Sequence, residues 1–415
     1  MEYGLIGEHL GHSFSKEIHN RIADYDYILK EIEPWKLTDF ITAREYRGLN
    51  VTIPYKQAVI ELLDYVDEAA LDIGAVNTIV NRDGRLYGYN TDYLGMRELI
   101  LNNGMDLQDA TVLILGSGGT SKTAYKVAES LGAKEIIKVS RHPKNGEITY
   151  EEAYRDYSYA DAIINTTPCG MYPETNGCPI DISRFTNLRA VVDAIYNPLN
   201  TRLVLSARQR GIKASGGLYM LVAQAVKASE LFFDTTYDPA VLDNIFRSME
   251  GQKKNIVLIG MPGCGKSTIG IALRDRLNRE FIDSDAEIVK RAGREIPQIF
   301  SEYGEEYFRK LESEVIFDLS KRTGIIIATG GGAVINNKNV EELKKNGELI
   351  WLNRPIEGIV PTDDRPLSND RDKLIKLFAV REPIYRAAAD REIDACDSIE
   401  GIVERIGSMY EHQNN

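Results

Sequence analysis

The sequence has no excess of basic charge that would suit a nucleic-acid partner. Its 415 residues include 50 lysines and arginines against 62 aspartates and glutamates, which gives a formal net charge of −12. Nucleic-acid phosphates would be repelled over most of such a surface, so we expect no nucleic-acid partner. A local basic patch around one bound nucleotide remains compatible with this total.

Clustered cysteines and long apolar runs are also missing. The four cysteines are scattered without a Cys-x-x-Cys pair or a histidine cluster, which excludes a disulfide framework and a zinc site. No run approaches the roughly 20 apolar residues of a membrane span. The segment Met1–Leu5 lacks the basic and apolar regions of a signal peptide. We therefore expect a soluble cytoplasmic protein with reduced thiols and no membrane partner.

Two series of short β-branched runs alternate with helical patterns. Such unalternated runs are typical of parallel sheets covered on both faces by helices. The expected strands are 111–115, 135–139, 162–164 and 190–195 in the first series, and 255–259, 325–328 and 349–352 in the second. The length suits about two to four domains. We place a boundary at the short polar segment 248–254, which gives domains 1–250 and 254–415.

A glycine-rich turn follows the strand expected at 111–115 and opens a helical stretch. It reads Gly116, Ser117, Gly118, Gly119, Thr120 and Ser121. Glycines let such a turn close and let backbone N–H groups approach a pyrophosphate at the helix N-terminus. Ser121 stands where the fingerprint has Gly or Ala, so the strand–turn–helix context carries the prediction of a dinucleotide site.

The end of the following strand bears on the choice of cofactor. It reads Ser140-Arg141, and an arginine there suits the 2′-phosphate of NADP, whereas an acidic residue would suit NAD. A solvated arginine is the alternative.

Seven further motifs surround this turn. They are residues 11–16, 50–56, 74–78 and 90–92 before it, and 165–171, 193–198 and 217–224 after it. In this order they resemble shikimate dehydrogenase over residues 1 to about 250. The resemblance implies NADPH-dependent reduction of 3-dehydroshikimate to shikimate. It also implies a substrate lobe (about 1–95 plus 217–250) and a Rossmann-type NADP-binding lobe (about 96–216).

The same resemblance implies residue roles. Lys56 and Asp92 match the catalytic pair and also bind substrate, and a lysine paired with an aspartate can supply a proton to a developing alkoxide. The remaining substrate positions are Ser13, Ser15, Thr52, Asn77, Tyr196 and Gln224. The cofactor positions are Gly116, Ser117, Gly118, Gly119, Thr120, Ser140, Arg141 and Gly217.

Alternatives exist for the first half. Taken alone, Lys56 would be a surface lysine and Asp92 a helix cap. Tyr219 departs from the family, which often has glycine there, near the nicotinamide. A quinate- and NAD-specific enzyme is the other candidate, and Arg141 together with the pair Ser13 and Ser15 disfavours it.

A complete phosphate-binding loop follows the strand expected at 255–259. Residues 260–268 read Gly-Met-Pro-Gly-Cys-Gly-Lys-Ser-Thr, a Walker A sequence between a strand and a helix. Lys266 is expected to neutralise the β- and γ-phosphate oxygens of ATP, and Ser267 to bind Mg²⁺. The N–H groups expected to hold the phosphates are those of Gly263, Cys264, Gly265, Lys266, Ser267 and Thr268.

Five later motifs suggest the reaction of this half. They are residues 283–285, 308–312, 328–332, 365–367 and 381–385. Together with the phosphate loop they resemble shikimate kinase over about residues 254–412. The resemblance implies a P-loop, three-layer α/β domain that transfers phosphate from ATP to the 3-hydroxyl of shikimate.

Residue roles again follow from the resemblance. Asp283 helps to hold Mg²⁺ through water, and Asp285 binds the shikimate hydroxyls and accepts a proton. The remaining positions are Arg309 and Arg381 for the substrate carboxylate, Gly331 and Gly332 against the ring, and Arg365 of the lid at the transferring phosphate and the nucleotide. Taken alone, residues 283–285 would form a solvated turn.

The two halves would catalyse consecutive steps on one small molecule, so a bifunctional enzyme is expected. A nucleotide-binding regulatory module without phosphotransfer is the alternative for the second half. Asp285, Arg309 and Arg381 disfavour it, because a regulator has no need of substrate ligands.

Overall fold

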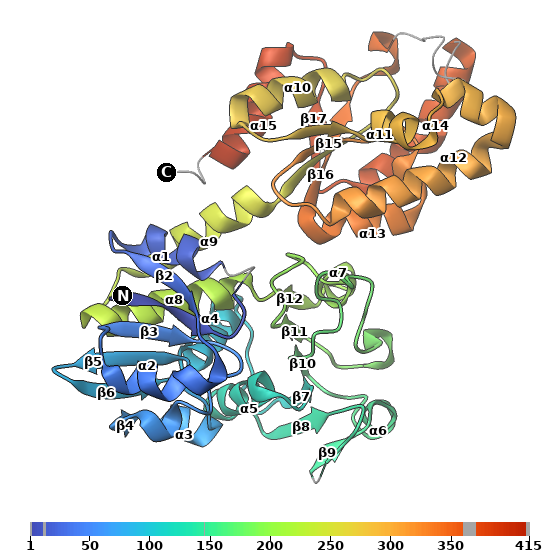
Figure 1. The fold of residues 1–415 in the computed structure, drawn as a ribbon. Helices are drawn as coiled ribbons and strands as arrows, with labels where there is room; N and C mark the ends of the chain where they lie inside the picture. Colours follow the sequence, from blue (N-terminus) through green and yellow to red (C-terminus); the bar gives the residue numbers. More distant parts are fainter. Residues whose placement is uncertain (1, 11–13, 145, 360–370, 412–415) are drawn as a thin grey trace. The chain divides into compact units, whose positions relative to one another are not determined.

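The fold is given by a computed structural model that describes residues 2–10, 14–144, 146–359 and 371–411. The chain divides into two compact units, shown in Figure 1. The first, here the front unit, comprises Met1–Asn197 and Thr201–Phe246, and the second, the back unit, comprises Pro198–Asn200 and Arg247–Asn415. Residues 248–253 belong to helix α9 (Pro239–Lys253). The polar segment at the predicted boundary is therefore the end of a helix and not an irregular connection.

The front unit begins with a mixed sheet in the order β2-β1-β3-β5-β6-β4. β1 is parallel to β2 and β3, whereas β5 runs antiparallel to both β3 and β6. Its buried apolar side chains, such as Ile6, Leu49 and Ile79, form one core cluster. The strands are β1 (Tyr3–Gly7), β2 (Tyr27–Glu31), β3 (Gly48–Val51), β4 (Tyr65–Val66), β5 (Thr78–Arg82) and β6 (Arg85–Tyr89). The helices are α1 (Ser15–Ile22), α2 (Leu37–Ala43) and α3 (Glu68–Ile73).

The second sheet of the front unit is all parallel, in the order β12-β11-β10-β7-β8-β9. This is the doubly wound order with a switch point between β7 and β10, so the expected Rossmann lobe is confirmed. The strand expected at 190–195 ends at Asp193, because the Asp193 carboxylate accepts the N–H of Ile195 and turns the chain. The strands are β7 (Thr111–Leu115), β8 (Glu135–Val139), β9 (Glu147–Ile148), β10 (Ala162–Asn165), β11 (Ala190–Asp193) and β12 (Lys213–Ser215). The helices are α5 (Gly119–Ser130), α6 (Tyr150–Asp156) and α7 (Arg202–Gln209).

Two helices of the front unit pack closely against each other, α4 (Thr91–Asn102) and α8 (Leu218–Phe233). A Cβ atom at Gly95 would lie 2.6 Å from the carbonyl oxygen of Met220, so only glycine permits this approach. The packing fixes the start of α4 relative to α8, and both helices carry predicted substrate residues.

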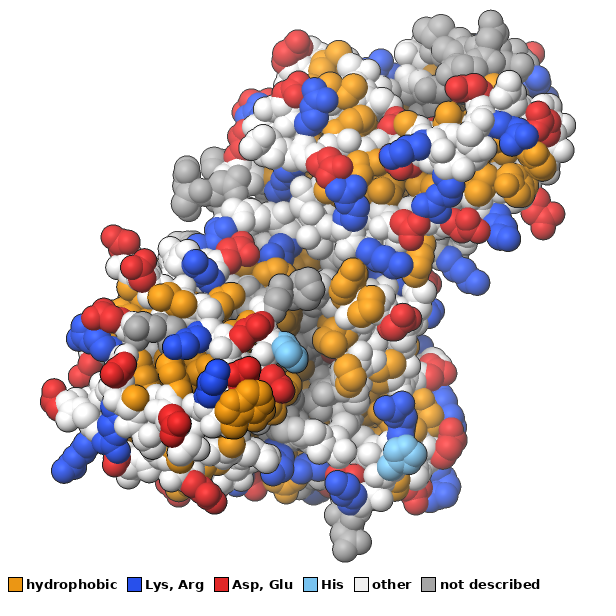
Figure 2. All heavy atoms as spheres, viewed as in Figure 1, with side chains coloured by type: hydrophobic (Ala, Val, Ile, Leu, Met, Phe, Trp, Pro, Cys, Tyr) orange, Lys and Arg blue, Asp and Glu red, His pale blue; other side chains and the backbone are white. Residues whose placement is uncertain are grey.

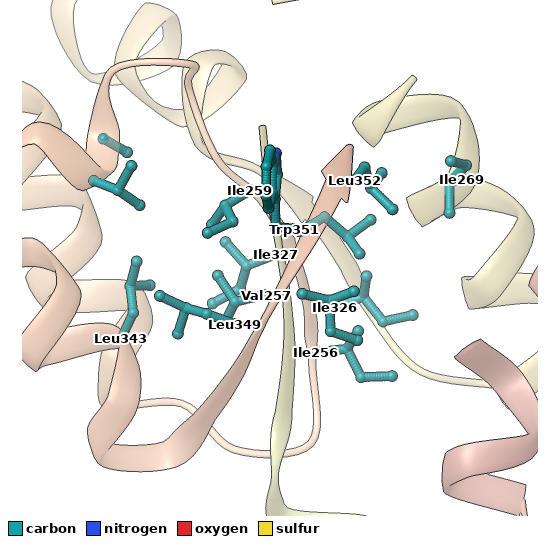
Figure 3. Close-up of a cluster of buried hydrophobic side chains, with 14 of the residues drawn as sticks. Ile256, Val257, Ile259, Ile269, Ile326, Ile327, Leu343, Leu349, Trp351 and Leu352 are labelled. Carbon is teal, nitrogen blue, oxygen red and sulfur yellow. The ribbon is translucent and has the colours of Figure 1, made fainter. Parts of the chain in front are cut away.

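The back unit is a five-stranded parallel sheet in the order β14-β15-β13-β16-β17 with helices on both faces (Figure 1). Figure 3 shows Ile256 and Ile326 on one face of the sheet, and Val257 and Ile327 on the other. Both faces are buried, which explains the unalternated apolar runs and confirms the expected three-layer α/β fold. The strands are β13 (Asn255–Ile259), β14 (Phe281–Asp283), β15 (Ile326–Ala328), β16 (Gly347–Asn353) and β17 (Arg391–Asp394). The helices are α10 (Lys266–Leu277), α11 (Ser284–Ala292), α12 (Ile296–Ser320), α13 (Asn337–Asn346), α14 (Arg371–Ala388) and α15 (Ile399–Glu411).

The face of each unit seen in Figure 2 carries both signs of charge. Figure 2 shows lysines and arginines interspersed with aspartates and glutamates over the visible face of each unit. The four cysteines are free thiols. Among the described helices, none combines the length and the apolar character that a membrane crossing requires.

Candidate active sites

A lysine and an aspartate form the charged pair of the front site. Lys56 lies in the loop after β3, and its Nζ donates to Oδ2 of Asp92 in the first turn of α4, at 2.6 Å. Asn90 caps α4 by accepting the N–H of Tyr93, which fixes the helix start. The side chains of Lys56 and Asp92 keep 29% and 22% of their surface exposed, so a ligand can reach the pair.

Two of the predicted substrate residues, Asn77 and Gln224, meet through a third residue. The N–H of Thr91 donates to Asn77 Oδ1 at 2.7 Å, and Thr91 Oγ1 lies 3.5 Å from Gln224 Oε1. All three residues are buried. The fold thus joins the loop before β5, the start of α4 and the middle of α8 into one polar wall next to Asp92.

The other predicted substrate residues of the front unit lie on three separate segments. Ser15 begins α1, Thr52 follows β3, and Tyr196 follows β11. The ring of Tyr196 meets the ring of Phe14 edge to face, with centroids 5.7 Å apart, which joins the start of α1 to the Rossmann lobe. Ser13 lies outside the described residues.

The glycine turn has one crowded position and two open ones. Gly116 has a φ of 110°, and a Cβ there would lie 2.8 Å from the hydroxyl oxygen of Thr166. At Gly118 and Gly119 a Cβ would meet nothing within 4 Å, so this side of the turn faces open space at the N-terminus of α5. Ser117 and Thr120 are exposed beside them. Ser121 Oγ instead donates to the carbonyl of Gly118 at 2.6 Å and stabilises the turn.

Arg141 is exposed at the end of β8, next to buried Ser140. Burial raises the pKa of the Cys169 thiol, and the positive charge of Arg141 opposes that shift. Arg141 follows the carboxyl end of β8, and ligands of this fold bind outside the carboxyl ends of the parallel strands.

The Tyr219 side chain packs against helix α9. Its hydroxyl donates to Asp243 Oδ1 at 3.1 Å, and its ring packs against Phe246, with centroids 5.1 Å apart. Both partners belong to α9. Gly217, two residues earlier, leaves no room for a Cβ beside the carbonyl of Ala194. The departure from the family at Tyr219 thus adds packing against α9.

The back site is a cavity of about 400 Å³. It joins the phosphate-binding loop to four of the later motifs, which are far apart in the sequence. The lining includes Lys266, Ser267, Asp283, Asp285, Arg309, Glu312, Gly331, Gly332 and Arg381, together with the apolar side chains of Ile296, Phe300 and Phe308.

Backbone conformation shapes the phosphate-binding loop. Gly263 and Gly265 have φ values of 82° and 102°, a region in which a side chain would be strained. Lys266 is buried at the start of α10, and its Nζ donates to the carbonyls of Gly260 and Met261 at 2.9 Å. Thr268 and the loop residue Cys264 also belong to this segment, and the Cys264 side chain is buried beneath it.

The side chains of Ser267 and Asp283 meet beside the phosphate-binding loop. Ser267 Oγ donates to Asp283 Oδ2 at 2.6 Å, while Asp283 Oδ1 accepts the N–H of Asp285 and caps α11. The capping bond holds Asp285 at the first turn of α11, facing Gly330: a Cβ there would lie 2.6 Å from Asp285 Oδ1.

Two arginines from distant helices converge on the glycine run 330–332. Arg309 Nη1 donates to Glu312 Oε2 at 2.8 Å, and its guanidinium fills the space that a Cβ at Gly332 would need. Arg381 is buried and donates to the carbonyl of Gly331 at 3.0 Å. Burial raises the pKa of Glu312, and Arg309 opposes this rise. Arg365 lies outside the described residues.

Comparison with known proteins gives the family. The shikimate dehydrogenase (NADP(+)) of Clostridium beijerinckii is 38% identical over 267 residues, which cover 61% of this chain and 99% of that protein. The chain belongs to the shikimate dehydrogenase family. The family model described as shikimate dehydrogenase substrate binding domain matches residues 5–79, and the model described as shikimate kinase matches residues 262–411. This shikimate dehydrogenase therefore also carries a shikimate kinase domain, and the expected bifunctional shikimate-pathway enzyme is confirmed.

Solved structures agree for the dehydrogenase part. A chorismate mutase/shikimate 5-dehydrogenase fusion protein from Clostridium acetobutylicum is 37% identical, with a TM-score of 0.57, and the match covers 60% of this chain and 96% of that one. A shikimate 5-dehydrogenase from Thermus thermophilus, in complex with NADP(H) and shikimate, is 28% identical, with a TM-score of 0.54, over 60% of this chain and 98% of that one. A quinate dehydrogenase from Corynebacterium glutamicum, in complex with NAD, is 27% identical with a TM-score of 0.54, over 60% and 99%.

Sequence reasoning assigned no role to two buried residues of this shikimate dehydrogenase and its kinase domain. Thr91 stands between Asn90 and Asp92, and Glu312 follows Arg309 by three residues on α12. The spacing of Arg309 and Glu312 was a usable signal, because residues three apart on a helix face each other. For Thr91 the sequence offered only its place inside a motif.

Proposed function

We propose that the front unit reduces 3-dehydroshikimate to shikimate with NADPH, and that the back unit phosphorylates the 3-hydroxyl of shikimate with ATP and Mg²⁺. The 2.6 Å contact between Lys56 and Asp92 carries the first assignment. The cavity shared by Lys266, Asp285 and Arg381 carries the second. The four free thiols fit the reducing cytoplasm, where we place both reactions.

In the reduction, Lys56 donates a proton to the alkoxide that develops at the substrate ketone. Asp92 holds the ammonium in place and supports its charge. NADPH, when bound, supplies the hydride. The open space at Gly118 and Gly119 fits a pyrophosphate against the N-terminus of α5, and Arg141 would hold the 2′-phosphate. Ser13, Ser15, Thr52, Asn77, Tyr196 and Gln224 would bind the substrate.

In the phosphorylation, Asp285 accepts the proton of the 3-hydroxyl, and Arg309 and Arg381 bind the substrate carboxylate. Lys266 and the N–H groups of residues 263–268 hold the phosphates. ATP, when bound with Mg²⁺, supplies the phosphoryl group. Ser267 and Asp283 offer the oxygen ligands that Mg²⁺ prefers, and their 2.6 Å contact places both at the loop mouth. Arg365 would stabilise the transferring phosphate.

A coupled assay tests both assignments. The purified chain is incubated with 3-dehydroshikimate, NADPH, ATP and Mg²⁺, and NADPH consumption and shikimate 3-phosphate are followed together. Both signals are expected, and omission of NADPH should prevent the phosphate product from 3-dehydroshikimate but not from added shikimate. Parallel assays with quinate and NAD test the alternative specificity. Faster turnover of that pair would overturn the first assignment.

A further inference from the structure

Thr91 is a fully buried residue at the edge of the dehydrogenase site, and no part of the proposed chemistry uses it. It lies between the helix cap Asn90 and Asp92, which accepts the hydrogen bond of the Lys56 ammonium. Both of its polar groups point at Asn77: its N–H lies 2.7 Å from Asn77 Oδ1, and its hydroxyl oxygen lies 3.2 Å from the same atom. Two hydrogen bonds from Thr91 to the Asn77 oxygen fix the orientation of the Asn77 side-chain amide.

The chemistry of the N–H group settles which way the Asn77 amide faces. A backbone N–H can only donate, so the side-chain atom 2.7 Å away must be the oxygen, and the NH₂ group must lie on the opposite side. Thr78 Oγ1 adds a further donor to this oxygen at 3.2 Å. Among the described residues, Asn77 Nδ2 has no hydrogen-bond partner, so the NH₂ group is the one that Asn77 can offer to a ligand.

A chain of hydrogen bonds runs from the buried Tyr27 hydroxyl to the Asn77 oxygen. The Tyr27 hydroxyl donates to Asn50 Oδ1 at 2.7 Å, and Asn50 Nδ2 donates to Thr78 Oγ1 at 3.0 Å. Burial raises the pKa of Tyr27 well above its usual value, so the hydroxyl keeps its proton. Thr78 Oγ1 lies 3.1 Å from Thr91 Oγ1. Because each hydroxyl carries a single proton, Thr78 accepts from Asn50 and passes its own proton on toward Thr91 or Asn77.

The chain ends on a second amide as well. Gln224 Nε2 donates to the carbonyl of Leu221 at 3.0 Å, which fixes the Gln224 oxygen on the side of Thr91. Thr91 Oγ1 lies 3.5 Å from that oxygen. The amide oxygens of Asn77 and Gln224 thus both face Thr91, whose single hydroxyl proton can be donated to only one of them at a time.

We infer that Thr91 is a positioning residue of the dehydrogenase, which turns the Asn77 oxygen inward so that Asn77 meets the substrate only as a donor. The inference rests on the proposed function, in which Asn77 binds the substrate. It specifies the chemistry of the partner: the substrate atom at Asn77 is an oxygen that accepts a hydrogen bond. The carboxylate of Asp92, one residue beyond Thr91, accepts hydrogen bonds. The substrate must therefore present an acceptor to Asn77 and a donor to Asp92.

Polarity at Asn77 is tested with two variants. Asn77→Asp keeps an inward oxygen for Thr91 but replaces the outward NH₂ group with a second oxygen, whereas Asn77→Ala removes both groups. If Asn77 must donate, the KM for shikimate in the NADP⁺-dependent reverse reaction should rise more for Asn77→Asp than for Asn77→Ala, by an additional factor of about ten. An Asn77→Asp variant that binds shikimate better than Asn77→Ala would overturn the inference.

The positioning role of Thr91 is tested separately. Thr91→Val keeps the shape and the N–H but removes the hydroxyl, and we expect the KM for shikimate to rise about tenfold. Thr91→Ser should restore it to within about threefold of the wild type. The KM for NADP⁺ and the kinase activity should stay unchanged, which a general loss of folding would not allow. Thr123→Val, at a buried threonine of α5 in the Rossmann lobe, is the matched control and should behave as wild type.

The outcomes separate this inference from the function on which it rests. A wild-type chain without reductase activity on 3-dehydroshikimate would remove the proposed function. An active wild type whose Thr91→Val variant keeps the wild-type KM for shikimate would leave that function standing and refute the positioning role of the Thr91 hydroxyl.

Discussion

The front and back sites hold their charges in different ways. In the front site the charged pair, Lys56 and Asp92, is partly exposed, and the buried polar groups around it are neutral amides and hydroxyls. In the back site three charged side chains are buried, those of Lys266, Glu312 and Arg381, and the side chain of Glu312 keeps only 1% of its surface exposed. A partly exposed ion pair adds little to stability, whereas a buried pair that loses one partner costs several kcal/mol. Substitution of a charged site residue should therefore change activity with little change in the free energy of unfolding in the front unit. In the back unit it should change both.

The largest effects are expected from the two functional lysines. Lys56→Met should lower the kcat of reduction by about 10²–10⁴-fold, because the proton donor is lost. Lys266→Met should lower the kcat of phosphorylation by about 10²–10³-fold, because a cation at the transferring phosphate is lost. Steady-state kinetics of both reactions on each variant provide the measurement. If either substitution silenced both activities in a folded chain, the two sites would not be independent.

Breaking the Arg309–Glu312 pair sharpens the contrast in stability. Arg309→Leu leaves the Glu312 carboxylate buried without its partner and should destabilise the back unit by about 3–5 kcal/mol. Lys56→Met should leave the front unit within about 1 kcal/mol of the wild type.

Tryptophan fluorescence in urea can report on the back unit alone. Trp351 is 1% exposed in the core of the back unit (Figure 3), whereas Trp35 in the front unit is 73% exposed and is removable as Trp35→Phe. An Arg309→Leu variant as stable as the wild type would mean that Glu312 finds a second partner, or that its charge is neutralised at little cost.

Arg141→Asp tests how far a single exposed charge decides cofactor choice in the front unit. Loss of a charge-assisted contact to the 2′-phosphate should raise the KM for NADPH about 10–100-fold and leave the use of NADH unchanged or improved. Reduction kinetics with each cofactor at saturating 3-dehydroshikimate are the test. Equal use of NADH and NADPH by the wild type would refute this role, and Lys138→Asp, on the same strand, serves as the charge-matched control.

The pH dependence of the back unit follows from Glu312. Burial raises its pKa above the ordinary value of 4.5, so the folded state binds the proton more tightly than the unfolded state. As the pH rises from about 4.5 through the folded pKa, the wild type should therefore lose stability relative to Glu312→Gln. The difference should grow by up to about 1.4 kcal/mol per pH unit within that window. Urea titrations of Trp351 fluorescence at several pH values measure it, and parallel curves for the two proteins would show that Glu312 does not titrate in this window.

The smallest effect concerns the contact between α8 and α9. Tyr219→Phe removes the hydrogen bond to Asp243 and should cost the front unit about 1 kcal/mol, with little change in the KM for NADPH. Retention of reductase activity in increasing urea reports on this unit. A large rise in the KM for NADPH would mean that the Tyr219 ring moves toward the cofactor when it binds.

Much of the fold could be predicted because the central strands of the two parallel sheets, such as β7 and β13, are buried along their whole length. The strands Thr111–Leu115 and Asn255–Ile259 coincide with their predicted runs, because an unalternated apolar run is buried on both faces only in the middle of a parallel sheet. The strand predicted at 190–195 ends at Asp193, before the apolar run does. The Asp193 carboxylate accepts the N–H of Ile195, and this bond competes with hydrogen bonding between the strands. The helical nature of residues 248–253 was hidden by their polar composition.

Local motifs by themselves determined where phosphates are expected to bind. To bind a phosphate, the two glycine loops need only their own backbone N–H groups and the N-terminus of the helix that follows. Consecutive residues are therefore enough to predict such a site. Only the tertiary structure decided which side chains face one another across the sites. It brought Lys56 to Asp92, buried Glu312 behind Arg309, turned Tyr219 onto α9, and placed Thr91 against two amides from different elements. Hydrogen-bond direction and burial depend on partners distant in the sequence, and they exist only once the helices and sheets have packed.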